Sequence, residues 1–252
     1  MDLRLTGKHV LVTGGSRGIG RAIVRAFLDE GAVVGFCSRN AAEVAATAEE
    51  LAGFGDVAGT AVDVGDGDAL AAWVASSAEA WGGLDVVVAN VSALAIPDTE
   101  ENWQTSLNVD LMHTVRMVRA ALPHLERSDS ASIIAISSVS GRESDFASGP
   151  YGTVKTAIVG YIHGLAMQLA GQGIRANTVS PGNTYFEGGV WQSIETGNAA
   201  LFELAMSLNP TGQMGKPEEV AAPVVFLASP LASRISGTNL VVDGALTRGI
   251  QL

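Results

Sequence analysis

The amino-acid sequence predicts an α/β protein in which helices cover both faces of a doubly wound parallel sheet of about seven strands. Short apolar segments alternate with helical patterns along most of the 252 residues. A glycine-rich turn joins the first apolar segment to the first helical pattern. No repeat, low-complexity tract or linker interrupts the alternation, so we expect residues 1–252 to form a single domain.

The expected strands are short and apolar, which is typical of strands buried on both faces of a parallel sheet. They span residues 10–13, 33–37, 57–62, 86–89, 133–137, 175–179 and 240–242. Helical patterns occupy about residues 18–29, 41–53, 67–81, 101–126, 151–171 and 217–228. Residues 183–214 lack this regularity. Because long irregular segments in compact domains are often functional, we expect a mobile, substrate-binding lid there.

The turn after the first expected strand reads Gly14-Gly15-Ser16-Arg17-Gly18-Ile19-Gly20. Glycine permits close approach of the backbone to a ligand, and the N-terminus of the following helix offers free N–H groups to a diphosphate. The alternative is a plain glycine-rich turn between a strand and a helix. The strand–turn–helix context favours nucleotide binding in a Rossmann-type fold.

Tyr151 and Lys155 are four residues apart on an expected helix, so their side chains lie on one face of it. A neighbouring ammonium favours the phenolate form of a tyrosine, which lets the hydroxyl exchange a proton near neutral pH. The same spacing also occurs on ordinary helices, where a half-buried ring lies beside a surface lysine. Other polar groups favour a catalytic pair, because Asn90, Ser138 and Pro181-Gly182 follow expected strands at their carboxyl ends.

Composition limits the class of function. The net charge of −11 argues against nucleic-acid binding, which requires a basic face. The single cysteine, Cys37, lies in an apolar run and is expected to be a buried structural thiol. The four histidines have no metal-ligand spacing, so we expect no metal. The N-terminus lacks the apolar core of a signal peptide and no apolar run approaches membrane-spanning length, so we expect a cytoplasmic protein without a membrane partner.

Together the motifs resemble the short-chain dehydrogenase/reductase family, and within it the 3-oxoacyl-reductase-like branch. The resemblance extends from Lys8 to Gly244. It rests on the order and spacing of the glycine turn after Thr13, Asp63-Val64, Asn90, Asn108, Ser138, Tyr151, Lys155, Pro181-Gly182 and Val242-Asp243-Gly244.

The resemblance implies an oxidoreductase that acts on a ketone or a secondary alcohol. Tyr151 would exchange a proton with the substrate oxygen, and Ser138 would orient that oxygen. Lys155 would tune Tyr151 and hold the nicotinamide ribose, and Asn108 would hold a water that links Lys155 to solvent. The alternative is a nucleotide-binding regulator that has lost catalysis, but such a protein would be free to lose at least one of these four residues.

The resemblance also favours NADP(H) over NAD(H). Family members that use NAD tend to end the second strand with an acidic residue, whereas this chain has Ser38 there, followed by Arg39. Arg39 and Arg17 would bind the 2′-phosphate. If both are solvated surface residues, the alternative is an NAD(H)-dependent alcohol dehydrogenase. The expected cofactor-binding residues are Gly14, Ser16, Arg17, Gly18, Ile19, Gly20, Ser38, Arg39, Asp63, Val64, Asn90, Tyr151, Lys155, Pro181, Gly182 and Thr184.

The chain departs from the family pattern near the expected nicotinamide site. Val91 and Ser92 stand where the family usually has Ala-Gly. Thr184 and Phe186 stand where the family often has an aliphatic residue and then a threonine.

The expected substrate is a medium-sized, mostly apolar carbonyl compound or the corresponding alcohol. The lid would supply its apolar wall through Phe186, Trp191, Phe202 and Met206, with Phe146 on the opposite side. The alternative is that these side chains pack the lid onto the body or onto a neighbouring subunit. A homo-oligomer, in this family most often a tetramer, is expected because the helix at 151–171 is apolar on more than one face through Ala157, Ile158, Tyr161, Ile162, Leu165 and Leu169.

Overall fold

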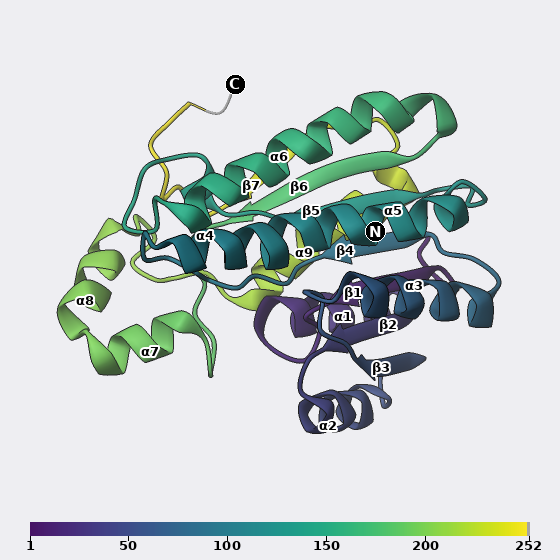
Figure 1. The fold of residues 1–252 in the computed structure, drawn as a ribbon, viewed down its shortest axis with the longest axis horizontal. Coiled ribbons are helices and arrows are strands. Elements are labelled where there is room, and N and C mark those ends of the chain that lie inside the picture. Colours follow the sequence, from purple (N-terminus) through teal and green to yellow (C-terminus); the bar gives the residue numbers. More distant parts are fainter. Residues whose placement is uncertain (251–252) are drawn as a thin grey trace.

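The computed structural model of the chain describes residues 1–250 and confirms the predicted fold class (Figure 1). Within these residues seven parallel strands form one sheet in the order β3-β2-β1-β4-β5-β6-β7. The strands are β1 (His9–Thr13), β2 (Val33–Ser38), β3 (Val57–Ala61), β4 (Val86–Ala89), β5 (Ser132–Ile136), β6 (Arg175–Pro181) and β7 (Asn239–Val242). Because every neighbouring pair is parallel, all the carboxyl ends lie at one edge of the sheet.

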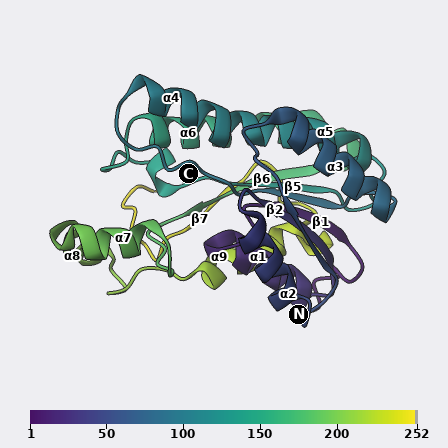
Figure 2. The same ribbon diagram turned by 60° about the horizontal axis from the view of Figure 1, so that its bottom comes forward.

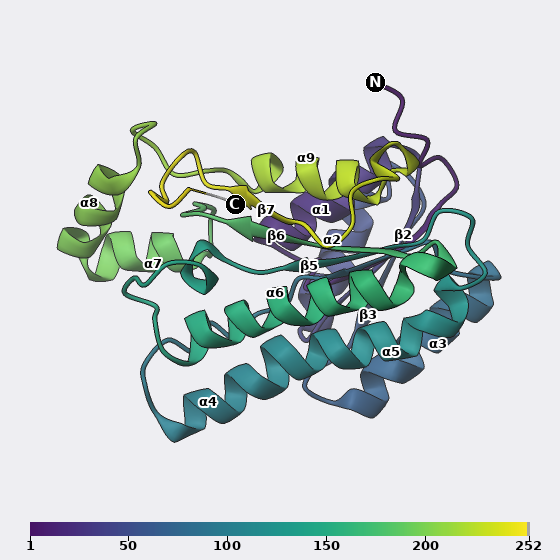
Figure 3. The same cartoon turned by 90° about the horizontal axis from the view of Figure 1, so that it is seen from above.

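Helices cover both faces of the sheet, as Figures 2 and 3 show. One layer holds α3 (Gly67–Trp81), α4 (Glu100–Ser106), α5 (His113–Leu125) and α6 (Pro150–Leu169). The other layer holds α1 (Gly18–Asp29), α2 (Ala41–Leu51) and α9 (Pro217–Ala228). Two short helices, α7 (Val190–Gly197) and α8 (Ala199–Leu208), stand apart from both layers (Figure 1).

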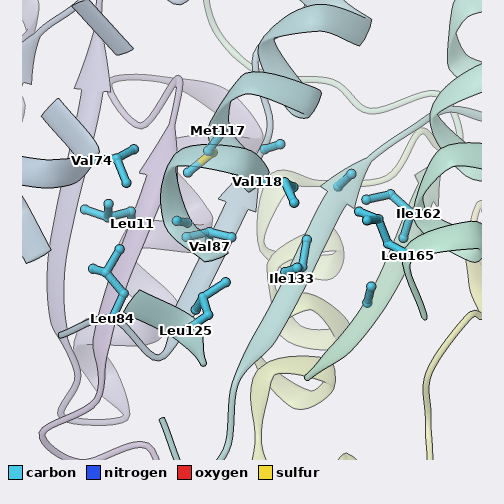
Figure 4. Packing of buried hydrophobic residues seen from close by; sticks show 14 of the residues in the cluster. Leu11, Val74, Leu84, Val87, Met117, Val118, Leu125, Ile133, Ile162 and Leu165 are labelled. Atoms are coloured by element: carbon cyan, nitrogen blue, oxygen red, sulfur yellow. The ribbon is translucent and has the colours of Figure 1, made fainter. Parts of the chain in front are cut away.

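The sheet divides the hydrophobic core into two clusters, because successive side chains of a strand point to opposite faces. Leu11, Val87 and Ile133 pack against α3, α5 and α6 in one cluster, which Figure 4 shows from close by. Val12 and Val88 belong to the other cluster, beneath α1 and α9. Burial on both faces explains why the central strands are apolar at almost every position.

The order of the strands reverses between β1 and β4. In a doubly wound sheet the ligand crevice lies at this reversal, outside the carboxyl ends of the strands. Thr13 ends β1 and Ala89 ends β4, so the glycine turn and Asn90 meet at this point.

Two segments differ from the sequence-based prediction. The helix expected at 101–126 contains a π-helical segment, η1 (Leu107–Met112), between α4 and α5. A π-helical segment changes which side chains face a neighbouring helix, and such segments are frequent at functional sites. The segment expected to be irregular contains α7 and α8, whose apolar side chains form a small separate cluster around Trp191, Ala205 and Met214.

Candidate active site

A cavity of about 480 Å³ lies at the carboxyl ends of the strands. It extends from the glycine turn after β1 to the first turn of α6 and the start of the segment at residues 183–214. The cavity is lined by most of the residues expected in the site, namely Gly14, Ser16, Arg17, Ile19, Gly20, Ser38, Arg39, Val64, Asn90, Ser138, Tyr151, Lys155, Pro181, Gly182 and Thr184.

The glycine turn leaves no space for a side chain at Gly20. A Cβ atom there would lie 2.0 Å from the carbonyl oxygen of Gly14 and 2.5 Å from Nδ2 of Asn90. Nδ2 of Asn90 donates hydrogen bonds to the carbonyl oxygens of Thr13 at 3.0 Å and of Gly14 at 3.3 Å. Asn90 therefore ties the end of β4 to the turn and fixes the floor of the cavity.

The N-terminus of α1 offers free hydrogen-bond donors to the cavity. Arg17, the residue before the helix, makes no side-chain cap, and the first turn of α1 contains no acidic residue. Free N–H groups and the positive end of the helix dipole favour an anion at such a position. Arg39 follows β2 at the same end of the cavity, is exposed, and forms no salt bridge with the part of the chain that the structure describes. This end of the cavity is suited to a phosphorylated ligand.

Ser138 lies at the carboxyl end of β5, where it begins a short 3₁₀ turn, Val139–Gly141. Its Oγ atom accepts a hydrogen bond from the backbone N–H of Ser140 at 3.2 Å. The preceding residue, Ser137, donates its hydroxyl to the carbonyl oxygen of Lys155 at 2.9 Å. This bond joins β5 directly to α6, so Ser138 keeps a fixed position relative to Tyr151 and Lys155.

Lys155 is almost fully buried, with 2% of its side chain exposed. Its Nζ atom donates to the carbonyl oxygen of Ile136 at 3.1 Å and lies 5.6 Å from the centre of the Tyr151 ring. Nζ also lies 3.3 Å from Oδ1 of Asp110, whose side chain is 1% exposed. The structure thus brings Ser138, Tyr151 and Lys155 together, as expected.

The structure does not bring Asn108 to Lys155. The Asn108 amide donates to the carbonyl oxygen of Gly65 at 3.3 Å, and its oxygen accepts from Arg116 at 2.7 Å. The π-helical segment directs Asp110, rather than Asn108, toward α6. Sequence reasoning missed Asp110 because a helix of regular pitch was assumed through residues 101–126 and because the amide fitted the family pattern.

His113 is a second buried residue that the sequence did not single out. Its Nδ1 donates to the carbonyl oxygen of Val109 at 3.1 Å, which leaves Nε2 to accept from the hydroxyl of Thr13 at 2.9 Å. The same hydroxyl oxygen accepts from the backbone N–H of Asn90 at 3.0 Å. Burial lowers the pKa of His113 to about 4, although the nearby Asp110 carboxylate acts in the opposite direction. The neutral imidazole therefore connects α5 to the end of β1, directly before the glycine turn, at neutral pH.

Two further expected residues, Gly18 and Asp63, do not line the cavity. The ring of Phe186 covers Gly18, where an added Cβ atom would lie 2.5 Å from the ring. The Asp63 carboxylate closes a tight turn by accepting from the N–H of Gly65 at 2.9 Å. Val64, next to Asp63, does line the cavity.

The five expected wall residues fall into two groups. Phe146, Phe186 and Trp191 line the cavity, and the rings of Phe146 and Trp191 meet edge to face with centres 5.7 Å apart. Phe202 and Met206 line a different hollow, between residues 185–214 and the start of α1. These two side chains also pack in the apolar cluster around Trp191, Ala205 and Met214, within residues 183–214 themselves rather than onto the body of the protein.

Cys37 is buried, and burial raises the pKa of its thiol to about 12, so the thiol stays protonated. Among residues 1–250 no group of three or more His, Cys, Asp or Glu side chains is arranged to hold a metal ion. The helices in this range are too short or too polar to cross a membrane.

Comparison with known proteins assigns the family. Residues 14–247 match a family model described as enoyl-(acyl carrier protein) reductase. Isoepoxydon dehydrogenase of Penicillium expansum is 43% identical over 98% of this chain and 97% of its own length. The relatives also include a 3-oxoacyl-[acyl-carrier-protein] reductase of Vibrio harveyi, which is 32% identical over 97% of this chain and 99% of its own length.

Solved structures agree with this assignment. A short-chain dehydrogenase from Burkholderia cenocepacia in complex with NADP has a TM-score of 0.88 and 31% identity, covering 96% of this chain and 99% of its own. L-sorbose reductase from Gluconobacter frateurii, complexed with NADPH and L-sorbose, has a TM-score of 0.91 and 26% identity. The match covers 99% of this chain and 100% of the reductase chain. The chain therefore belongs to the short-chain dehydrogenase/reductase family of oxidoreductases.

The lowered pKa of His113 predicts a loss of stability in acid. Between about pH 6.5 and pH 4 the unfolded chain binds a proton at this histidine that the folded chain excludes, so the free energy of unfolding falls as the pH falls. For His113 alone the loss between about pH 7 and pH 5 is about 2 kcal/mol. Urea denaturation at both pH values measures it. His113→Gln should reduce this pH dependence, whereas the exposed His163→Gln should not, and equal pH dependence in all three proteins would contradict the prediction.

Proposed function

We propose that the protein is an NADP(H)-dependent oxidoreductase that interconverts a ketone and a secondary alcohol. One observation carries the proposal. A single cavity connects the uncapped N-terminus of α1 to the hydroxyl-bearing residues Ser138 and Tyr151 and to Lys155. An anion-binding end next to proton-exchanging groups is the arrangement that hydride transfer between a dinucleotide and a carbonyl compound requires.

The residues present fit NADP(H). The close approach at Gly20 lets a diphosphate reach the backbone N–H groups of α1, and Arg17 and Arg39 line the cavity where a 2′-phosphate would be bound. The structures from Burkholderia cenocepacia and Gluconobacter frateurii contain NADP and NADPH. When bound, this cofactor supplies or accepts a hydride.

In this proposal the side chains of the chain handle the proton and the orientation of the substrate. The Tyr151 hydroxyl gives a proton to the carbonyl oxygen during reduction and takes one from the alcohol during oxidation. Ser138 donates a hydrogen bond to the same oxygen. The Lys155 ammonium, 5.6 Å from the centre of the Tyr151 ring, attracts the negative charge that develops on the Tyr151 oxygen during proton transfer.

The substrate we propose is a medium-sized, mostly apolar carbonyl compound, because Phe146, Phe186 and Trp191 line the cavity beside Ser138 and Tyr151. The lid at residues 183–214 supplies two of these three rings. A sugar is the second candidate, because the solved structure of L-sorbose reductase is similar over the whole chain.

We also propose a homo-oligomer, but the structure reduces the support for it from the sequence. Ile158, Ile162, Leu165 and Leu169 of α6 are used in the core of the same chain. Ala157 and Met167 stay exposed on this helix, Met167 with 76% of its surface, and they remain available for a contact between subunits.

Tyr151→Phe tests the proposed chemistry. The variant keeps the ring but removes the exchangeable proton, so kcat should fall by about 10²–10⁴-fold while the affinity for NADPH changes little. Steady-state rates with a ketone panel, together with fluorescence titration of NADPH, measure both quantities. A variant with near wild-type kcat would refute the role of Tyr151, and a wild-type protein that binds NADPH but reduces no ketone would favour the silent regulator.

Arg39→Ala tests the choice of cofactor. The wild-type protein should prefer NADPH, and the variant should lose about 10-fold or more in kcat/KM for NADPH with little change for NADH. The reason is that arginine forms charge-assisted, bidentate bonds with a phosphate, whereas NADH offers only an uncharged hydroxyl at that position. Arg25→Ala is the matched control, since Arg25 is an α1 residue paired with Asp29. A wild-type preference for NADH would contradict the assignment.

Trp191→Ala tests the wall of the substrate pocket. Removing the ring should raise KM for apolar ketones by about 10-fold and leave the Kd of NADPH nearly unchanged, because the ring contributes apolar contact area. Phe202→Ala is the control, because this ring belongs to the lid but lines the other hollow. Identical kinetics in the two variants would show that Trp191 does not contact the substrate.

A further inference from the structure

A buried ion pair lies behind the cavity, between η1 and α6. Oδ1 of Asp110 is 3.3 Å from Nζ of Lys155, and the two side chains are 1% and 2% exposed. The other oxygen, Oδ2, accepts from the backbone N–H of Ala93 at 3.0 Å. Apart from the contact with Lys155, Oδ1 has no partner in the part of the chain that the structure describes. One oxygen of the carboxylate is thus anchored by the backbone, and the other is directed at the ammonium.

The other charged groups near this pair are engaged elsewhere or neutral. On α5, Arg116 binds Asn108 and the carbonyl oxygen of Gly65, and burial keeps His113 neutral above about pH 4 by lowering its pKa. On α6, Tyr151 is the neighbouring titratable group. Both acidic residues of the first turn of α4 are exposed to solvent. Within residues 1–250, Asp110 therefore provides the one negative charge in contact with Lys155.

We propose that Asp110 is a positioning residue for the reaction at Tyr151, and that its carboxylate holds the Lys155 ammonium in place and reduces the positive field at the Tyr151 hydroxyl. The inference rests on the proposed function of Tyr151 and Lys155. An unpaired buried ammonium would favour the phenolate strongly, whereas an ammonium paired with a carboxylate favours it less. A weaker field suits a tyrosine that begins the reaction as a proton donor.

The first experiment measures the pair without substrate or cofactor. Asp110→Asn, Lys155→Met and the double variant are compared with the wild-type chain by urea denaturation. Each single change leaves a partner of the pair unmatched in the interior, so each should lower the unfolding midpoint. The double variant should lower it by less than the sum of the two single effects. Additive effects would overturn the proposed pairing.

The second experiment measures the effect on proton transfer. The pH profile of kcat/KM for oxidation of a secondary alcohol is recorded for the wild type and for Asp110→Asn, which keeps the shape of the side chain and removes its charge. The rising limb of the variant should move to lower pH by about one unit, because a unit charge several ångströms away is removed. Asp68→Asn removes one charge from an exposed position on α3 and should leave the profile unchanged.

The results separate the failure of this inference from failure of the proposed function. If Tyr151→Phe is inactive and the profile of Asp110→Asn matches the wild type, the proposed function holds and the role of Asp110 is refuted. If the wild type oxidises no alcohol and reduces no ketone, the proposed function fails, and with it the role of Asp110 in catalysis. The urea experiment then still decides whether the two residues form an energetic pair.

Discussion

The candidate site depends on the burial of the Lys155 ammonium. A charge that is removed from water must be compensated by polar partners within the protein. The carbonyl oxygen of Ile136 and the carboxylate of Asp110 provide these partners for Lys155. The carbonyl group of Lys155 in turn accepts from Ser137. These contacts fix β5, η1 and α6 in one relative position. The placement of Ser138 and Tyr151 beside each other follows from it.

The sequence predicted the parts of the molecule that obey local rules. Apolar runs identified the strands, and the glycine turn identified the cavity end at α1, where a Cβ atom at Gly20 would collide with Gly14. The spacing of Tyr151 and Lys155 was sufficient to place both at one cavity, since α6 is a regular helix across them. Family membership, which the comparisons show, was predicted from the order of the same motifs.

The errors arose where tertiary contacts decide the local structure. The apolar pattern at residues 101–126 fits a continuous helix, and it does not reveal the π-helical segment that directs Asp110 toward Lys155 and Asn108 toward Arg116. Helices α7 and α8 were missed because they pack mainly on one another. Phe202 and Met206 are apolar like Trp191 and Phe146, so the sequence alone cannot show that they line a different hollow.

The central claim is that one cavity brings a nicotinamide cofactor and a carbonyl compound together for direct hydride transfer. The most direct measurement uses NADPH labelled with deuterium at C4 of the nicotinamide, a panel of apolar and polyhydroxylated ketones, and mass spectrometry of the products. The account predicts a secondary alcohol that carries one deuterium on its carbinol carbon. Tight binding of NADPH without a labelled alcohol from any ketone would contradict it.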